Sequence, residues 1–136
     1  MKKLVLVLAA VLILTACGRE TPAPQTVSFS LEANPTTGYS WQVSQSEELF
    51  KVESSYAQKH AGGQVGAGGL ETFTLMPLKA GTTELTLTYA RPWENGEKAD
   101  QLVYSFEVDS NLQVTMTNGY STAVDEPIPV PTPTIT

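Results

Sequence analysis

The side chains that could do covalent or acid–base chemistry are few and far apart in this sequence. The chain has one cysteine, Cys17, and one histidine, His60, which stands in a glycine-rich stretch. One Cys and one His do not make a zinc site, and a lone loop histidine is far more often solvated than catalytic. Glu47 and Glu48 are adjacent, as in a solvated turn, and no Ser-His-Asp set can be assigned. The sequence therefore predicts no enzyme, no metal site and no cofactor.

The chemistry that suits Cys17 is attachment of lipid through its sulfur. Lys2 and Lys3 give a positive start, and residues 4–14 form an unbroken apolar run. That run has the length of a signal-peptide core and is short for a membrane span. The sequence Leu14-Thr15-Ala16-Cys17 resembles the lipobox of bacterial lipoproteins, in which the cysteine becomes the first mature residue. The alternative is an ordinary secretory signal with an incidental cysteine.

The lipobox resemblance implies a signal peptide over residues 1–16 and a lipidated tether over residues 17–25. Several acyl chains, such as palmitate, hold a protein firmly on a membrane, whereas one chain binds only marginally. We therefore expect a lipid-anchored protein on the periplasmic or extracellular side of the cell envelope. Loss of residues 1–16 leaves six basic and 14 acidic residues, a net charge of −8. This charge provides no basic patch, so nucleic acid is not expected as a partner.

The residues best suited to binding begin with the hexapeptide Asn34-Pro35-Thr36-Thr37-Gly38-Tyr39. Pro35 fixes its own φ and pushes the residue before it towards extended conformations. The two threonines are stiff at χ1, and Gly38 can take a positive φ at little cost. The hexapeptide should be a stiff projection that loses little entropy on docking, which favours a binding loop over a plain connector.

Two further stretches also interrupt the strand pattern. Residues 56–69 contain five glycines, which favour either a floppy surface loop or a backbone that approaches another chain closely. Residues 90–97 contain Arg91-Pro92-Trp93, followed by the tight-turn signal Asn95-Gly96. The Trp is either tucked onto its own domain or exposed as a binding hot spot. The Arg either donates bidentate hydrogen bonds or lies solvated.

The elements that must position these stretches are short strands. Apolar and polar residues alternate with period two, which marks half-buried strands. The strands are expected over residues 26–32, 39–44, 50–54, 71–76, 82–89 and 101–109. These segments predict an all-β domain over residues 26–110, an antiparallel Greek-key sandwich, with Trp41 in its core. Alternate connections of such a sandwich meet at one end, so the loops at 34–38, 62–69 and 91–96 should cluster.

The last part of the chain, residues 111–136, has a different composition. Residues 111–117 could add an edge strand. Four prolines follow at alternate positions, namely Pro127, Pro129, Pro131 and Pro133. Because proline lacks the N–H that a sheet ladder needs, these residues predict an extended, disordered tail.

Three motifs, in this order, resemble the signature loops of the chagasin family, whose members are protein inhibitors of papain-like cysteine proteases. The motifs are Asn34-Pro35-Thr36-Thr37-Gly38-Tyr39-x-Trp41, Gly66-Ala67-Gly68-Gly69 and Arg91-Pro92-Trp93. The resemblance implies an immunoglobulin-like fold and a three-loop edge that binds the protease. The residues that it assigns to this edge are Asn34, Pro35, Thr36, Thr37, Gly38, Tyr39, Gly66, Gly68, Gly69, Arg91, Pro92 and Trp93.

The resemblance also implies how the three loops would act on the protease. The first loop would enter the active-site cleft, the glycine loop would lie along the substrate cleft like an added strand, and the Trp would pack beside the active site. Inhibition would be reversible and tight, with no bond offered for cleavage. Glu94 and Glu97 could tune the choice of protease electrostatically. We take a monomer as the working expectation. The alternative is an immunoglobulin-like envelope or adhesion lipoprotein that turns the same loops towards a partner other than a protease.

Overall fold

The structure, a computed structural model, describes residues 21–58, 68–91, 93, 98–123 and 129–136. Its strands are β1 (Val27–Ala33), β2 (Ser40–Gln45), β3 (Phe50–Gln58), β4 (Gly69–Pro77), β5 (Gly81–Ala90), β6 (Lys98–Val108), β7 (Val114–Ala123) and β8 (Thr134–Ile135). A short 3₁₀ turn, η1 (Pro35–Thr37), connects β1 to β2. Within the described ranges, no helix is long and apolar enough to cross a membrane.

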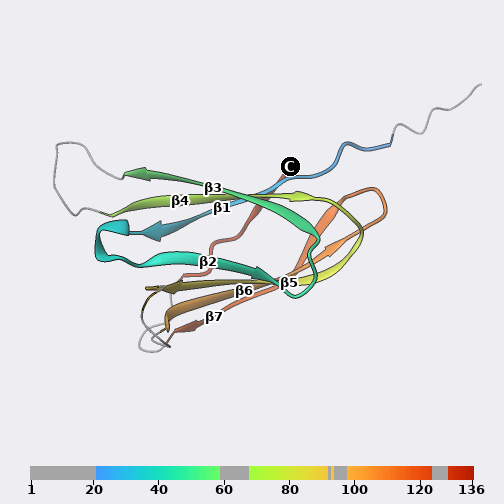
Figure 1. Cartoon of the computed structure of the whole chain (residues 1–136). Coiled ribbons are helices and arrows are strands. Elements are labelled where there is room, and N and C mark those ends of the chain that lie inside the picture. The colour runs from blue at the N-terminus through green and yellow to red at the C-terminus, as the bar shows by residue number, and fades with distance from the viewer. Residues whose placement is uncertain (1–20, 59–67, 92, 94–97, 124–128) are drawn as a thin grey trace, which may run out of the picture.

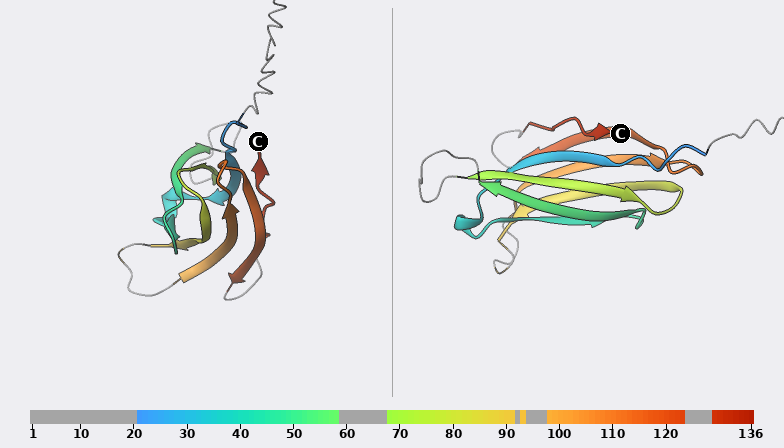
Figure 2. Two further views of the ribbon diagram at one scale, coloured as in Figure 1. Left: turned by 90° about the vertical axis from the view of Figure 1, so that its right-hand side faces the viewer. Right: turned by 90° about the horizontal axis from the view of Figure 1, so that it is seen from above.

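The strands form two four-stranded antiparallel sheets that pack face to face (Figures 1 and 2). One sheet has the order β3-β4-β1-β8 and the other has the order β2-β5-β6-β7. The expected antiparallel sandwich is therefore confirmed. The strands start and end within a few residues of the expected positions, but β3 continues to Gln58 and β4 begins at Gly69. These two strands extend the sheet towards the glycine-rich stretch.

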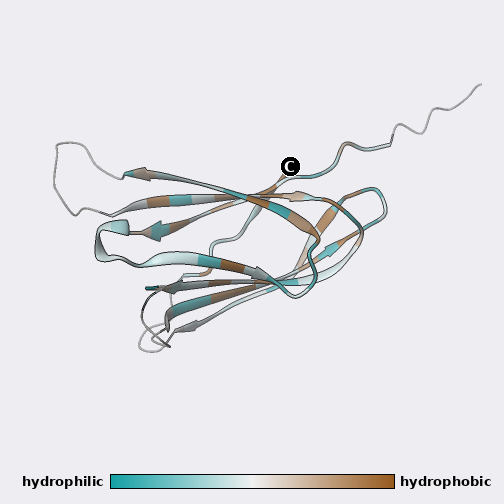
Figure 3. Ribbon diagram, viewed as in Figure 1, coloured by the Kyte–Doolittle hydropathy of each residue, from teal (hydrophilic) through white to brown (hydrophobic). Residues whose placement is uncertain are grey.

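Period-two alternation places one face of each strand in a common apolar core between the sheets (Figure 3). Aromatic rings from both sheets meet there. The ring centroid of Phe29 lies 5.4 Å from that of Phe73 in its own sheet and 5.1 Å from that of Tyr104 in the other. Phe50 meets Phe106 edge to face, with a centroid distance of 5.5 Å. These contacts hold the sheets in a fixed relation, so the loops at their ends have a rigid base.

The C-terminal ends of β1, β3 and β5 and the N-terminal ends of β2, β4 and β6 all lie at one end of the sandwich, which we call the loop end (Figure 1). The strand register confirms this arrangement, because Ala33 pairs with Gly69 and Ser40 pairs with Ala90. The N-terminal segment reaches β1 at the opposite end, where Thr26 and Thr136 exchange two backbone hydrogen bonds of 2.8 and 3.0 Å. The domain thus presents its loops on the side away from its N-terminal segment.

The prediction of a disordered tail is wrong for residues 129–136. Residues Thr134–Ile135 form β8 and pair with Val27 and Ser28 of β1, while Val130 and Ile135 pack against the core. The alternating prolines permit this pairing because β8 is an edge strand. The even-numbered residues of this strand point their backbone N–H groups at β1. The prolines are odd-numbered, so the missing N–H of each lies on the side away from β1. β7, which also falls partly in the predicted tail, lies at the edge of the second sheet.

Deletion of residues 129–136 should lower the free energy of unfolding by about 2 kcal/mol, through lost edge pairing and partial loss of two apolar contacts. Urea unfolding of the full-length domain and the truncated domain measures this change. Thr132→Ala is the matched control, because Thr132 is an exposed residue of the same segment. An unchanged unfolding midpoint after truncation would show that the segment does not stabilise the sandwich.

Tyr104 links the second sheet to this C-terminal segment. Its side chain is buried, and its hydroxyl donates a hydrogen bond of 2.8 Å to the carbonyl of Pro131. Burial raises the pKa of Tyr104 from 10.0 to about 12, since the phenolate would lose its hydration. The neutral phenol thus contributes stability that is complete below pH 10 and is lost as the pH rises towards 12.

We expect the stability of the domain to fall by roughly 2–3 kcal/mol across this interval through Tyr104 alone. Chemical denaturation at a series of pH values from 9 to 12 measures the slope. Tyr104→Phe should be less stable than the wild type at pH 9, and its stability should fall less steeply with pH. Equal slopes in the two proteins would contradict the assignment.

Candidate functional site

The first predicted loop is a compact turn held by its own hydrogen bonds. The Asn34 carbonyl accepts from the Thr37 backbone N–H at 3.1 Å and from the Thr37 hydroxyl at 2.7 Å. The Gly38 N–H donates to the Pro35 carbonyl at 3.0 Å, and the Thr36 hydroxyl donates to the Asn34 side-chain oxygen at 2.5 Å. Pro35, Thr36 and Thr37 are exposed at the apex. The loop therefore projects as expected from the sequence, and the hydroxyls of Thr36 and Thr37 both donate hydrogen bonds within the turn.

Gly38 has the positive φ expected of it, 82°, which is the left-handed conformation that ends the 3₁₀ turn. The Trp93 ring lies directly over this residue. A Cβ built on Gly38 would be 2.5 Å from the Cη2 atom of the ring, so only glycine leaves room for it. Gly38 therefore serves both the turn and the contact with the third loop.

The third loop contacts the first through two more interactions. The Arg91 Nε donates a hydrogen bond of 3.1 Å to the carbonyl of Thr37. Its guanidinium carbon lies 4.6 Å from the centroid of the Tyr39 ring, in the geometry of a cation–π contact. Trp93 is nevertheless 68% exposed. The two alternatives for this residue are thus both partly true, since the ring rests on Gly38 and still presents most of its surface to solvent.

The second loop adjoins the first at the end of β1. A Cβ on Gly68 would lie 3.1 Å from the Ala33 carbonyl and 3.7 Å from Asn34 Cβ. Gly69 is buried against the backbone of Ala57 and the ring of Tyr56, and a Cβ there would collide with both. At these two glycines, the close backbone approach occurs within the protein itself. The structure thus brings the described parts of all three loops together.

Several predicted residues lie outside the described part of the chain. They are Cys17, His60, Gly66, Pro92, Glu94 and Glu97. The assignments made to them from the sequence stay predictions. Among the described residues, no group of three or more His, Cys, Asp or Glu side chains could hold a metal ion.

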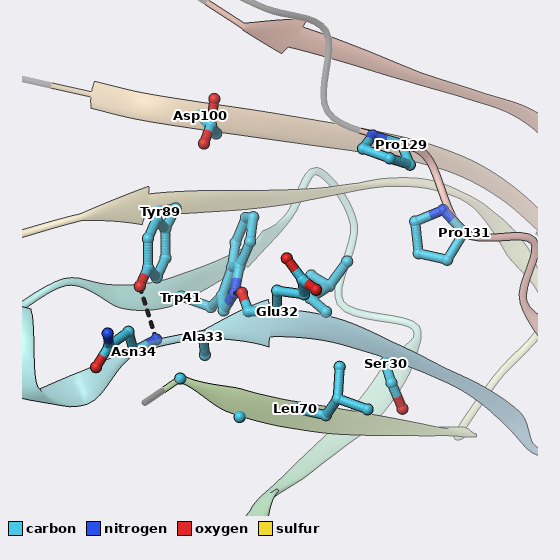
Figure 4. Close-up of a pocket in the computed structure, with 13 residues that line it drawn as sticks. Ser30, Glu32, Ala33, Asn34, Trp41, Leu70, Tyr89, Asp100, Pro129 and Pro131 are labelled. Atoms are coloured by element: carbon cyan, nitrogen blue, oxygen red, sulfur yellow. Dashed lines mark hydrogen bonds between the residues drawn. The ribbon is translucent and has the colours of Figure 1, made fainter. Parts of the chain in front are cut away.

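Sequence reasoning missed Tyr89, which lies beneath the loops (Figure 4). Its hydroxyl accepts a hydrogen bond of 2.9 Å from the backbone N–H of Asn34. Its ring stacks on Tyr39 at 5.3 Å and contacts Trp41 at 4.8 Å between centroids. Trp41 is half-buried at the margin of the core and donates its indole N–H to the Glu32 carbonyl at 3.0 Å. A signal was available, because Tyr89 stands two residues before Arg91 at the end of a strand.

A groove of about 730 Å³ lies beside this cluster. Asn34, Trp41, Tyr89 and Leu70 line it, and Pro129 and Pro131 of the C-terminal segment close one side (Figure 4). The rings of Trp41 and Tyr89 are therefore accessible through this groove from the side of the domain.

Comparison with known proteins gives a consistent result. Residues 21–108 match the family described as chagasin family peptidase inhibitor I42. The chain is 38% identical over 82 residues to amoebiasin-2 of Entamoeba histolytica, which covers 58% of this chain and 67% of that protein. It is 40% identical over 73 residues to chagasin of Trypanosoma cruzi, which covers 49% and 66% respectively. The chain thus spans about two thirds of the length of these relatives.

A solved structure agrees with these matches. The crystal structure of the cysteine protease inhibitor EhICP2 from Entamoeba histolytica superposes with a TM-score of 0.52 at 35% identity, covering 59% of this chain and 75% of that one. The family match covers the three loops and strands β1 to β6, whereas β7 and β8 follow it. The fold, the clustered loops and the sequence match together place this chain in the chagasin family of peptidase inhibitors.

Proposed function

We propose that this protein is a reversible, tight-binding inhibitor of papain-like cysteine proteases, whose three loops occlude the active-site cleft. One observation carries the proposal. The described residues of the three family motifs converge on one end of the sandwich, where Trp93 packs on Gly38 and Arg91 bonds to Thr37. Because this edge is assembled before any partner arrives, little loop ordering remains to oppose binding.

The shape of the first loop explains how it could enter a protease without being cut. A substrate lies extended in the cleft and places its scissile carbonyl among oxyanion-stabilising donors. In this loop, the chain forms a 3₁₀ turn, and the carbonyls of Asn34, Pro35 and Thr37 already accept hydrogen bonds from within the inhibitor. These bonds hold the chain in the turn, which would have to open before the chain could lie extended as a substrate does. The loop therefore suits occupancy of the cleft and not turnover.

The test of this proposal is titration of papain activity with residues 18–136, produced without a lipid. Stoichiometric loss of activity, recovered on dilution and with an uncut inhibitor chain, would support the proposal. Progressive cleavage of the chain between residues 34 and 39 would instead identify a slow substrate. A folded domain that leaves papain and a panel of related proteases fully active would favour the immunoglobulin-like envelope module.

We further propose that Cys17 carries lipid and that the protein acts as a monomer at the cell envelope, on the periplasmic or extracellular side of a membrane. The position of the N-terminal segment supports this arrangement. It enters β1 at the end opposite the loops, so an anchor there would leave the loop end facing away from the membrane (Figure 1). Mass spectrometry of the mature N-terminus, with Cys17→Ser as control, tests the modification. An unmodified Cys17 in the membrane fraction would contradict it.

A further inference from the structure

The end of β5 and the third loop contact the first loop through alternate residues. Tyr89, Arg91 and Trp93 stand two apart, and each contacts a different part of the turn. Tyr89 bonds to Asn34 at its base, Arg91 to the Thr37 carbonyl at its far side, and Trp93 covers Gly38. Two of them belong to the motif Arg91-Pro92-Trp93, whereas Tyr89 lies in β5, outside every motif.

Tyr89 differs from the other two in how it is held. It pairs directly with Trp41 in the ladder between β5 and β2, and its ring contacts that indole. It is partly buried below the apex of the loops, whereas Trp93 is 68% exposed. Because Tyr89 lies below the apex, it is suited to holding the first loop in place. The first loop itself would contact the partner.

The bond from Asn34 to Tyr89 joins the two sheets where the β1 ladder stops. The pairing of β1 with β4 ends at Ala33 and Gly69, so Asn34 is the first residue beyond it. Asn34 precedes the 3₁₀ turn, and its side-chain oxygen accepts a hydrogen bond from the Thr36 hydroxyl in place of a cap bond from a backbone N–H. Its N–H instead donates to the Tyr89 hydroxyl from the opposite sheet, at 2.9 Å. This bond is made at the first residue after the chain leaves the β1 ladder.

We infer that Tyr89 is a positioning residue for inhibition. Its hydroxyl fixes the departure of the first loop from β1, and its ring supports Tyr39, on which Arg91 rests. The inference rests on the proposed function in so far as it concerns protease binding. In the variant without this hydroxyl, the first loop samples more conformations when free, and that freedom is lost again in the complex. The consequence is a faster dissociation of the protease from a domain that remains folded.

The test compares Tyr89→Phe, which removes the hydroxyl alone, with Tyr89→Leu, which also removes the stacked ring. Tyr120→Phe is the matched control, since Tyr120 is 42% exposed on the edge strand β7. The first readout is hydrogen exchange of the Asn34 backbone amide by NMR, in the inhibitor alone. The second is the pair of association and dissociation rate constants with papain, measured beside the melting temperature.

In Tyr89→Phe, we expect the Asn34 amide to exchange about tenfold faster and papain to dissociate about three- to tenfold faster, the range set by loss of one hydrogen bond. The association rate constant should stay near wild type, and the melting temperature should fall only by the few degrees that loss of one hydrogen bond costs. Tyr89→Leu should have a larger effect, and Tyr120→Phe should have none.

Two results would overturn the inference. One is unchanged Asn34 exchange in Tyr89→Phe, which would mean that the hydroxyl does not hold the loop. The other is faster exchange with an unchanged dissociation rate, which would mean that the bond has no part in inhibition. If the wild-type domain inhibits neither papain nor the panel of related proteases, the proposed function fails and the role in inhibition fails with it. The exchange measurement still decides whether Tyr89 positions the loop.

Discussion

Gly38→Ala should weaken inhibition of papain by about 1,000-fold, or roughly 4 kcal/mol, while the domain remains folded. Two effects add. The left-handed φ of 82° disfavours any residue with a Cβ, so the free loop relaxes to another shape that must be reversed on binding. The new methyl also displaces the Trp93 ring, which lies 2.5 Å from the Cβ position, from the binding edge.

The measurement is the papain inhibition constant of Gly38→Ala together with its unfolding midpoint. Gly81→Ala is a matched control, because Gly81 also has a positive φ, 150°, but lies at the opposite end of the sandwich, where its Cβ would meet Leu49 at 3.2 Å. The control should lose stability and keep its inhibition constant. If both variants lose the same affinity, the effect of Gly38→Ala comes from general destabilisation and the loop end is not the site.

Trp93→Ala is expected to raise the inhibition constant by about 100-fold, near 3 kcal/mol, as for an aromatic hot spot. The side chain is 68% exposed, so the free domain gains little stability from it. A protease that covers the ring would remove a large apolar area from water with few rotors to freeze. The substitution should therefore separate affinity from stability more cleanly than the change at Gly38.

The control for this second variant is Leu78→Ala. Leu78 is 60% exposed and lies in the β4–β5 connection, at the end of the domain away from the loops. Inhibition constants from progress curves should change for Trp93→Ala alone, with both unfolding midpoints close to that of the wild type. Wild-type inhibition by Trp93→Ala would remove the third loop from the proposed interface.

Much of the sandwich could be predicted from the sequence because its signals are local. Alternation of apolar residues, as through Leu85, Leu87 and Tyr89, depends only on the period of a strand and the presence of one buried face. The convergence of the loops followed from connecting such strands in a two-sheet sandwich. The turn at Asn34 was equally readable, since Pro35 and Gly38 restrict the backbone by their own covalent structure.

The parts that could not be predicted depend on contacts between distant residues. The bond from Asn34 to Tyr89 joins positions 55 residues apart, and the alternation around Tyr89 is the same whether its hydroxyl faces solvent or a loop. The C-terminal segment is a similar case. Its prolines exclude it from a central strand, but whether such a chain finds an open edge depends on β1 having one. That edge becomes visible only when the sheets are assembled.

The placement of β1 between the N-terminal segment and the first loop has a mechanical consequence. A pulling force applied between Thr26 and a partner held at the turn Pro35–Thr37 passes along the covalent backbone of one strand. Because β1 and β5 lie in different sheets, the same force reaches the Trp93 loop through β2 and its ladder with β5, which it loads in shear. Along-strand shear strains many hydrogen bonds at once and does not open them one by one. Under tension the first loop should therefore stay connected to the N-terminal segment through β1 itself.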